Sequence, residues 1–550
     1  MKKQMYLLAL LLVAGTTLSL AQSRVFKAVS SEMSSQVKAI MQHEVLMGYV
    51  VFSKLEKMNN DSFSYKLTIM DENLNDIGTY AFKDGDLQLQ QVAFEQDVLC
   101  LAYLKNIYKK PAKDVKRRKV MRTKGNVVFY GEEQADREDY YKFVPENIKS
   151  FVYSQFLNLE GKLIATASEP VKLNHHQYAA HFANSFNGYL KNGLQLSSIE
   201  GKGFALVYGD GDKESVGQKK GSDEHLLVYD FQGAEILKKR LPNAVSEGLE
   251  LVSAGSYMYV LRRTDTKDGT KFELLSYNLD DSTFYKMHQV GNKDRFQYKV
   301  MAFKKRAGSG LPYLSGTIIN EGYPLWIAQN RNIKQGQYAG VFNIDLDGAD
   351  YKEHFTYWSG NKKKDAISRK GYIRQVSAYS DMDYTYDDYN GNTYFSGSGV
   401  KTNTRWGTIA ASILTLPTLV APPAILFMCG TTRFNSNHLV TLRQDSSGKL
   451  SCTSMHKTKN YFYAMGGKLG RAYPNNKSLF AVHNDDKRAT YLVFSDAGRI
   501  AIYDVATQKE IRSIPTSERK ASVYPAKAGH ILLSEYNSGD GSTKLSIEAL

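Results

Sequence analysis

Residues 226–237 read LLVYDFQGAEIL, and this stretch holds the pattern that decides the fold. A strand-like apolar run ends at Tyr229, the residues from Asp230 to Gly233 follow, and Ile236 opens a second such run. Asp favours tight turns because its side chain accepts hydrogen bonds from the backbone that follows, and Gly readily adopts positive φ. The stretch therefore predicts a β-hairpin.

The same hairpin pattern occurs seven times along the chain. Its copies start at residues 65, 151, 226, 274, 341, 439 and 491. This spacing is irregular, but it is compatible with blades of ~40–50 residues that carry insertions. Further strand-like pieces, such as 204–208, 257–261 and 392–395, supply the other strands of four-stranded units. The 37 tyrosines agree with this interpretation, because aromatic residues favour strands.

The repeated hairpins predict an all-β fold, namely a β-propeller of six to eight four-stranded blades, with seven preferred. Residues 48–52 and 543–550 both have a strand-like pattern, and terminal strands that share a blade would close the ring and remove exposed edges. A pair of β-sandwich domains is the alternative, because it also has short strands and frequent turns. Two short stretches, 30–42 and 177–190, are predicted to be helices.

Residues 1–21 are predicted to be a cleavable secretory signal peptide. Lys2 and Lys3 precede an apolar run at 7–14, and small residues lead to Ala21. The run is shorter than the ~20 residues that span a bilayer, and no cysteine follows that could carry a lipid. We therefore expect an exported product that is periplasmic, extracellular or associated with the outer membrane. The expected parts are the signal peptide at 1–21, an N-terminal helical or linker segment at 22–47, and the propeller at 48–550.

The chain is basic, because 71 Lys and Arg residues outnumber 56 Asp and Glu residues. In an exported protein this charge favours contact with lipid head groups, acidic polysaccharide or released nucleic acid rather than a genome, or it serves solubility alone. Cys100, Cys429 and Cys452 lie too far apart for a metal-binding spacing and allow at most one disulfide. Cys100 lies in an apolar run and is predicted to be a buried thiol.

A basic insertion is predicted at about 105–150. Ten of the twenty residues from 105 to 124 are Lys or Arg. Such a cluster is either an anionic-surface contact or a solvated loop neutralised by the acidic residues at 132–139. The candidate contact residues are Lys116, Arg117, Arg118 and Lys119.

An apolar insertion is predicted at about 401–435, where residues 406–432 contain no charge. Pro417 and the pair Pro422-Pro423 divide it into halves that are too short to cross a bilayer. The insertion would pack on the propeller, dock a partner protein or make a peripheral membrane contact. The candidate contact residues are Ile413, Leu414, Leu416, Ile425, Leu426 and Phe427.

Two acidic loops place oxygen ligands around a glycine, as a hard cation such as Ca²⁺ requires. Neither has the EF-hand spacing, and Asp or Asn with Gly also forms ordinary hairpin turns. No cofactor is therefore expected, with Ca²⁺ as the alternative. The candidate ligands are Asp345, Asp347, Asp350, Asp388, Asn390 and Asn392.

No catalytic motif stands out, and no catalytic residue is assigned. His175, His176 and His181 lack the i, i+4 spacing of a helical zinc site, and there is no GxSxG elbow. Paired carboxylates are numerous, so a carbohydrate-active hydrolase with carboxylates in the central channel is the alternative function.

The Asp-x-x-Gly turns and the segment IYDVATQKEI at 502–511 resemble exported, multi-bladed propeller proteins of Gram-negative, Bacteroidota-like bacteria, many of unknown function. The segment is similar to the outer strand of WD-like and quinoprotein-like blades. Trp-Asp pairs and regular tryptophan motifs are absent, which argues against a quinone cofactor. The leading hypothesis is an exported, non-enzymatic binding or scaffolding propeller of the cell envelope, whose partner is an envelope protein or a glycan and not nucleic acid.

Overall fold

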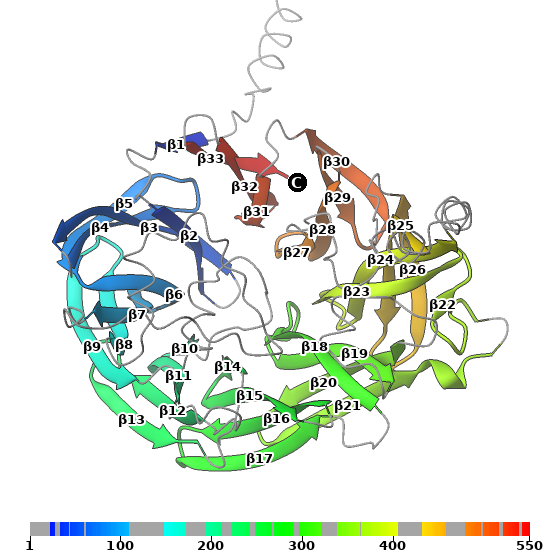
Figure 1. Cartoon of the computed structure of the whole chain (residues 1–550), viewed down its shortest axis with the longest axis horizontal. Coiled ribbons are helices and arrows are strands. Elements are labelled where there is room, and N and C mark those ends of the chain that lie inside the picture. The colour runs from blue at the N-terminus through cyan, green and yellow to red at the C-terminus, as the bar shows by residue number, and fades with distance from the viewer. Residues whose placement is uncertain are drawn as a thin grey trace, which may run out of the picture.

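The strands of the computed structural model follow one another around a ring (Figure 1). In the described residues they form eight antiparallel sheets, which we number in chain order. The structure describes residues 23–27, 34–42, 45–59, 62–108, 148–171, 194–211, 222–241, 248–266, 269–290, 296–320, 338–362, 365–404, 432–457, 479–496, 499–515, 521–527, 529–537 and 542–550.

Sheets 1 to 4 each contain four consecutive strands. Sheet 1 contains β2 (Ser34–Gln42), β3 (Val45–Asn59), β4 (Ser62–Asp71) and β5 (Asp76–Asp84). Sheet 2 contains β6 (Asp86–Glu95), β7 (Val98–Tyr108), β8 (Ile148–Asn158) and β9 (Leu163–Val171). Sheet 3 contains β10 (Leu194–Ile199), β11 (Gly203–Gly211), β12 (Ser222–Tyr229) and β13 (Glu235–Arg240). Sheet 4 contains β14 (Gly248–Ala254), β15 (Tyr257–Thr266), β16 (Gly269–Asn278) and β17 (Thr283–Val290).

Sheets 5 to 7 continue the ring, and sheet 6 has one extra short strand. Sheet 5 contains β18 (Phe296–Lys305), β19 (Pro312–Asn320), β20 (Tyr338–Asp347) and β21 (Asp350–Tyr357). The 3₁₀ helix η2 (Trp358–Gly360) leads to sheet 6, which contains β22 (Tyr372–Ile373), β23 (Ala378–Asp387), β24 (Thr393–Thr404), β25 (Thr432–Gln444) and β26 (Leu450–Lys457). Sheet 7 contains β27 (Leu479–Asn484), β28 (Ala489–Asp496), β29 (Arg499–Asp504) and β30 (Lys509–Pro515).

Sheet 8 combines strands from the two ends of the chain. Its strands are β31 (Ala521–Pro525), β32 (His530–Asn537), β33 (Ser542–Ala549) and β1 (Ser23–Lys27). β1 pairs antiparallel with β33, with Val25 opposite Lys544. The predicted all-β propeller is confirmed, since four-stranded antiparallel sheets stand around a ring. The described residues form eight sheets, the upper limit of the predicted range, rather than the preferred seven.

Each sheet is buried on both of its faces. On β7, Leu99 and Leu101 pack with sheet 1, whereas Cys100 and Ala102 pack with sheet 3. Every later pair of neighbouring sheets shares a hydrophobic cluster in the same way, and so do sheets 8 and 1. The alternative of two β-sandwiches does not fit, because a sandwich buries one face of each sheet. The predicted burial of the Cys100 thiol is confirmed.

The helix predicted over residues 30–42 is wrong where the structure describes it, because 34–42 form strand β2. Val37, Ala39 and Met41 contact the cluster shared with sheet 8, and Ile40 belongs to the cluster shared with sheet 2. Apolar side chains on both faces of a strand hide the period of two that would distinguish it from a helix. The described part of the 22–47 segment is therefore strand, while the helix predicted at 177–190 lies outside the described residues.

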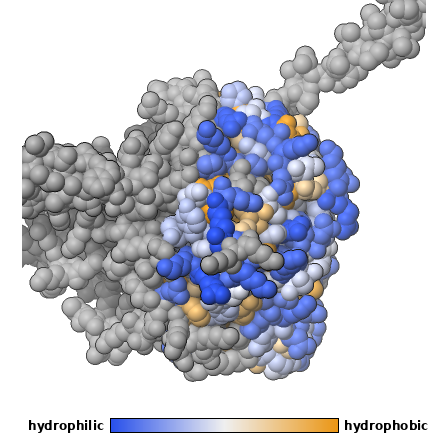
Figure 2. Space-filling model, turned by 90° about the vertical axis from the view of Figure 1, so that its right-hand side faces the viewer, coloured by the Kyte–Doolittle hydropathy of each residue, from blue (hydrophilic) through white to orange (hydrophobic). Residues whose placement is uncertain are grey.

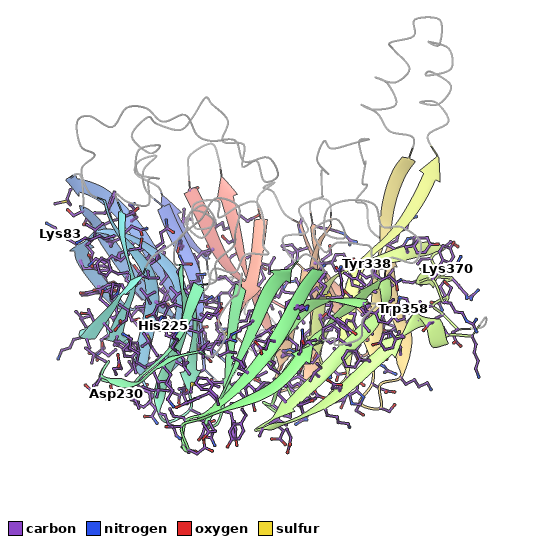
Figure 3. All side chains as sticks on the ribbon, turned by 60° about the horizontal axis from the view of Figure 1, so that its bottom comes forward. Lys83, His225, Asp230, Tyr338, Trp358 and Lys370 are labelled. Carbon is purple, nitrogen blue, oxygen red and sulfur yellow. The ribbon has the colours of Figure 1, made fainter. Side chains whose placement is uncertain are left out.

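The ring has two faces with different connections. In a sheet of four consecutive antiparallel strands, each strand runs opposite to the one before it. The connection from the first to the second strand and that from the third to the fourth strand therefore lie at one edge of the ring. The connection from the second to the third strand lies at the other edge, together with the link to the next sheet. The first edge forms the short-turn face, where the turns include 71–76, 158–163, 230–235, 388–393, 445–450 and 504–509. The second edge forms the long-connection face, where the longest connections are 109–147, 172–193, 212–221, 321–337, 405–431 and 458–478. In Figure 3, Asp230 lies at the lower edge of the ring, and Tyr338 and Lys370 lie toward the opposite edge.

The turn predicted from Asp230 to Gly233 is confirmed in detail. The Asp230 Oδ1 atom accepts hydrogen bonds from the N–H groups of Gln232 and Ala234, at 2.8 Å each. Gly233 has φ of 75°, a conformation in which a side chain is strained, and a Cβ there would also lie 2.8 Å from the ring of Phe156. Asp71, Asp388 and Asp445 accept the same pair of backbone hydrogen bonds.

We predict that Leu101→Ala lowers the free energy of unfolding by about 2–5 kcal/mol, because it opens a cavity between sheets 1 and 2. Urea denaturation followed by circular dichroism measures the change. The control is Leu163→Ala at a partly exposed position on β9, where we expect less than about 1 kcal/mol. Equal losses for the two variants would contradict a core that lies between sheets.

Candidate functional site

Both predicted insertions leave the ring on the long-connection face. The 109–147 segment joins β7 to β8, whose ends pair at Tyr108 and Ile148. The 405–431 segment joins β24 to β25, whose ends pair at Thr404 and Thr432. The residues predicted to contact an anionic surface or a partner lie outside the described residues: Lys116, Arg117, Arg118, Lys119, Ile413, Leu414, Leu416, Ile425, Leu426 and Phe427.

The candidate ligands at 388–392 form a hairpin turn on the short-turn face. The Asp388 Oδ1 atom accepts the N–H groups of Asn390 and Asn392, at 2.9 Å each. Its Oδ2 atom accepts the side-chain amide of Asn392 and the hydroxyl of Tyr394, at 2.8 Å each. Both oxygens of this carboxylate are therefore occupied by the turn itself.

The candidate ligands at 345–350 lie at the end of β20 and the start of β21. Asp345 Oδ1 accepts a hydrogen bond from Arg306 Nε at 2.7 Å. Asp347 and Asp350 are backbone partners across the hairpin, where the carbonyl of Gly348 accepts the hydroxyl of Tyr259 at 3.1 Å. Within the described ranges no group of three or more His, Cys, Asp or Glu side chains is arranged to hold a metal ion.

A buried polar cluster joins the inner strands of sheets 5, 6 and 7 at the short-turn face. We call it the Asp387 cluster, formed by Lys304, Arg306, Tyr313, Asp345, Asp387 and His483. The side chain of Asp387 is fully buried. Its oxygens accept the Ala307 N–H at 2.6 Å and the Tyr313 hydroxyl at 3.1 Å, with Lys304 Nζ at 3.5 Å.

Arg306 completes the Asp387 cluster from the first turn of sheet 5. Besides Asp345, its guanidinium donates to Asn343 Oδ1 at 3.0 Å and to Thr393 Oγ1 at 3.2 Å. The guanidinium also lies 4.3 Å from the ring centre of Tyr313, a favourable cation–π distance. The charges of Arg306 and Asp345 therefore compensate each other while they hold sheets 5 and 6 together.

His483 is the group in the Asp387 cluster whose chemistry resembles that of a catalytic site. Burial lowers the pKa of its imidazole, while the carboxylate of Asp387, 4.0 Å from Nε2, opposes that shift. Its Nδ1 atom lies 3.1 Å from Thr490 Oγ1. A neutral imidazole beside a carboxylate has the ingredients of a general base. The Asp387 oxygens, however, already accept hydrogen bonds from groups of the protein itself. Asp387 therefore suits a structural role, in which it holds neighbouring sheets together.

A second buried ion pair joins sheets 3 and 4. Arg262 and Glu224 are almost fully buried, and Arg262 Nε lies 2.6 Å from Glu224 Oε2. The carboxylate of Glu273 lies 3.1 Å from Nη1 of the same guanidinium. Neither this pair nor the Asp387 cluster was predicted from the sequence. Residues 304–306 are all basic, and residues 387–388 are both acidic. These two runs of opposite charge are the sequence signal that could have indicated the cluster.

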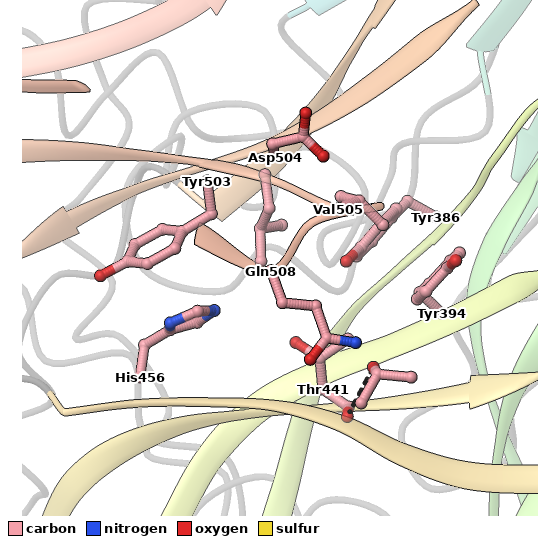
Figure 4. Close-up of a pocket in the computed structure, with 10 residues that line it drawn as sticks. Tyr386, Tyr394, Thr441, His456, Tyr503, Asp504, Val505 and Gln508 are labelled. Atoms are coloured by element: carbon pink, nitrogen blue, oxygen red, sulfur yellow. Dashed lines mark hydrogen bonds between the residues drawn. The ribbon is translucent and has the colours of Figure 1, made fainter. Parts of the chain in front are cut away.

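A pocket between sheets 6 and 7 is lined by ten residues, of which four carry aromatic rings (Figure 4). The rings of Tyr386 and Tyr394 stack with centroids 5.0 Å apart, and the His456 ring lies 3.6 Å from the Tyr503 ring. Burial lowers the pKa of His456 to about 4, although the charge of Glu510 opposes the shift. The pocket contains one acidic residue, Asp504, whose carboxylate accepts backbone hydrogen bonds of its own turn.

A second cavity lies between sheets 5 and 6 and is largely apolar. Trp358, Ile367 and Ile373 form part of its wall, and it has no acidic lining residue. Among the described residues, the indole N–H of Trp358 finds no hydrogen-bond partner. Neither of these two cavities brings two carboxylates together.

Comparison with known proteins gives one family match over part of the chain. Residues 1–138 match the model of a family of unknown function (DUF6770). Among curated proteins, no sequence matches this chain. No helix in the described part of the chain is long and apolar enough to span a bilayer.

Three solved structures illustrate the structural likeness. The Dos1 propeller has 9% identity and a TM-score of 0.43, with 96% of this chain and 95% of that chain covered. The WD40 domain of SCAP from fission yeast has 8% identity and a TM-score of 0.37, with 96% and 98% covered. The polysaccharide lyase Uly1 has 10% identity and a TM-score of 0.39, with 86% and 93% covered. Likeness at this level carries no information on the chemistry of this chain.

We predict that Asp387→Asn lowers the free energy of unfolding by about 3 kcal/mol, because it removes the buried carboxylate that accepts the Ala307 N–H and the Tyr313 hydroxyl and faces Lys304. Urea denaturation at pH 7 measures the loss. Asp486→Asn at an exposed position in sheet 7 is the control, with an expected change within about 0.5 kcal/mol. If the Asp387→Asn variant is as stable as the parent chain, the cluster does not hold the sheets together.

We predict that acid destabilises the fold through His456. Its pKa is about 4 in the folded chain and near 6.5 when unfolded, so the unfolded state alone takes up the proton as pH falls from 6.5 to 4. Stability should fall across this window by up to about 3 kcal/mol, then change no further through this group. His456→Phe should remove that loss, as measured by thermal or urea unfolding at pH 4, 5, 6 and 7. If the variant keeps the full pH slope, other groups cause the acid sensitivity.

Proposed function

We propose that this chain is an exported, non-enzymatic binding propeller of the cell envelope whose ligand contacts the long-connection face. Export is inferred from residues 1–21, which have the pattern of a signal peptide. The observation that carries the proposal is the difference between the two faces. The longest connections, including both insertions, start and end on one face of the ring.

The short-turn face is less suited to a ligand. Its Asp side chains, including Asp230, Asp388 and Asp445, already accept the N–H groups of their own turns. Binding loops are commonly variable segments carried by a rigid scaffold. The short turns and the clusters between sheets supply that scaffold, and the long connections supply the loops that it carries.

The alternative function, a carbohydrate-active hydrolase, requires two carboxyl groups about 5–10 Å apart at one substrate position. Of the two cavities described above, one has Asp504 as its acidic residue and the other has none. We favour binding because of the long connections gathered on one face, and the experiment below includes a measurement that would identify the hydrolase.

The test compares the mature chain with two variants in co-sedimentation with isolated cell envelopes. One variant replaces 405–431 with Asn-Gly, and the other replaces 109–147 with Asn-Gly. Both designs are feasible because Thr404 faces Thr432, and Tyr108 faces Ile148, as antiparallel partners. The control exchanges the turn residues Ser446 and Ser447 for Ala and Asn on the short-turn face.

We expect at least one loop variant to lose about tenfold or more in envelope binding, while the control binds as the parent does. Parent-like binding by both loop variants would refute a role for the two insertions, and absence of binding by the parent would refute the proposed function. Release of reducing ends from a panel of polysaccharides by the parent chain would instead support the hydrolase.

A further inference from the structure

A small basic hairpin projects from the long-connection face between sheets 5 and 6. It follows η2, and its two sides meet in an antiparallel bridge between Ile367 and Ile373. Ser368 braces the turn, because its Oγ atom accepts the N–H groups of Lys370 and Tyr372, at 3.3 and 3.0 Å. Arg369 and Lys370 therefore stand at the tip of a fixed turn. Lys370 lies at the periphery in Figure 3, farther out than Trp358.

The base of the hairpin is fixed in the protein interior. Ile367 and Ile373 are 4% and 1% exposed and belong to the cluster between sheets 5 and 6. Gly371, with φ of 77°, allows the turn to pass the indole of Trp358, which a Cβ would approach to 3.2 Å. The tip is thus held at a set position over the cavity that Trp358 lines.

Two arginines on this hairpin have preset orientations. Arg369 Nε donates to the Asn361 carbonyl at 3.0 Å, and Arg374 Nε donates to the Asp365 carbonyl at 2.9 Å. Both side chains are otherwise exposed, and their terminal nitrogens have no partner in the described structure. A guanidinium held in this way needs to lose little freedom when it binds a carboxylate with both terminal nitrogens.

The positive charge of the hairpin is not neutralised within the described residues. Lys362, Arg369, Lys370 and Arg374 are exposed and make no ion pair there. Asp365 is the acidic residue of the segment 358–377, and its carboxylate accepts the N–H of Lys362 at 2.5 Å. The hairpin therefore presents a cluster of uncompensated cations.

We propose that this basic hairpin binds an acidic polysaccharide, with carboxylates of uronic-acid units at the terminal nitrogens of Arg369 and Arg374. The inference rests on the proposed function, because it names the ligand class for the same face. The Tyr372 and Tyr379 rings, in contact with centroids 5.2 Å apart, are half-buried beside the hairpin and give a sugar ring an aromatic edge to pack on.

A polysaccharide suits this surface better than a membrane does. Insertion into a bilayer needs exposed apolar side chains beside the cations. The apolar residues of the hairpin point inward instead, and no large hydrophobic residue of the described segment 365–379 is exposed. Figure 2, which faces the side of the ring where β22 and β26 lie, shows mostly hydrophilic residues on the described surface.

The test measures binding of polygalacturonate to the full mature chain by isothermal titration calorimetry at low salt. The hairpin variant carries Arg369→Gln, Lys370→Gln and Arg374→Gln. The matched control removes the same charge from exposed positions on the short-turn face, with Lys162→Gln, Lys449→Gln and Lys509→Gln. A third variant, with Arg369→Lys and Arg374→Lys, keeps the charge but loses the two planar guanidinium groups that can bind a carboxylate with two nitrogens.

We expect the hairpin variant to bind polygalacturonate at least about tenfold more weakly, the lysine variant to be intermediate, and the control to stay within about threefold of the parent. Dextran, a neutral polysaccharide, should not bind. Equal weakening in the hairpin variant and the control would reduce the effect to net charge and overturn the proposal. Thermal unfolding of each variant verifies that it folds.

Three further outcomes distinguish failure of this inference from failure of the proposed function. If the parent binds isolated envelopes but the hairpin variant binds polygalacturonate as well as the parent does, the inference fails and the binding function stands. If the parent sediments with vesicles of anionic phosphatidylglycerol and the hairpin variant does not, the hairpin is a membrane contact and the polysaccharide proposal is wrong. If the parent binds neither envelopes nor polygalacturonate, both proposals fail.

Discussion

The need to bury both faces of every sheet is the constraint on which the rest of this structure depends. A strand such as β7 sends Leu99 and Leu101 to one neighbour and Cys100 and Ala102 to the other, so no sheet can end the series without exposing a core. Eight shared clusters satisfy this requirement in the described residues. Because the cores consist of strands alone, variation in chain length is restricted to the connections.

The junctions between sheets also contain charge, at two places along the ring. Arg262 and Glu224 meet between sheets 3 and 4, and the Asp387 cluster joins sheets 5 to 7. Burial of charge is costly unless the partners and hydrogen bonds are complete. Such pairs discriminate between correct and incorrect packing of neighbouring sheets, since a sheet that slides out of register leaves a charge without its partner.

The sequence predicted the features that depend on local chemistry. The turn after Asp230 follows from its own side chain and from Gly233, and the burial of Cys100 follows from its apolar neighbours. The Asp387 cluster could not be predicted in this way, because residues 304, 345, 387 and 483 meet only once three sheets are assembled. Strand β2 was mistaken for a helix because Val37, Ile40 and Met41 give it apolar residues on both faces. The charges at 362–374 were visible in the sequence, but the hairpin that gathers them was not.

The pairing of β1 with β33 has a consequence for the order of assembly. Sheets 1 to 7 are each made from strands that are close in sequence, and they can form as the chain lengthens. β1 can pair only with a strand that comes more than 500 residues later, and this is the least local strand pairing in the described part of the chain. Until residues 542–549 are available, sheet 8 is incomplete and the flanks of sheets 1 and 7 are open. Loss of residues 23–27 and loss of residues 542–546 would therefore remove the same contact, because each of these segments is the partner of the other.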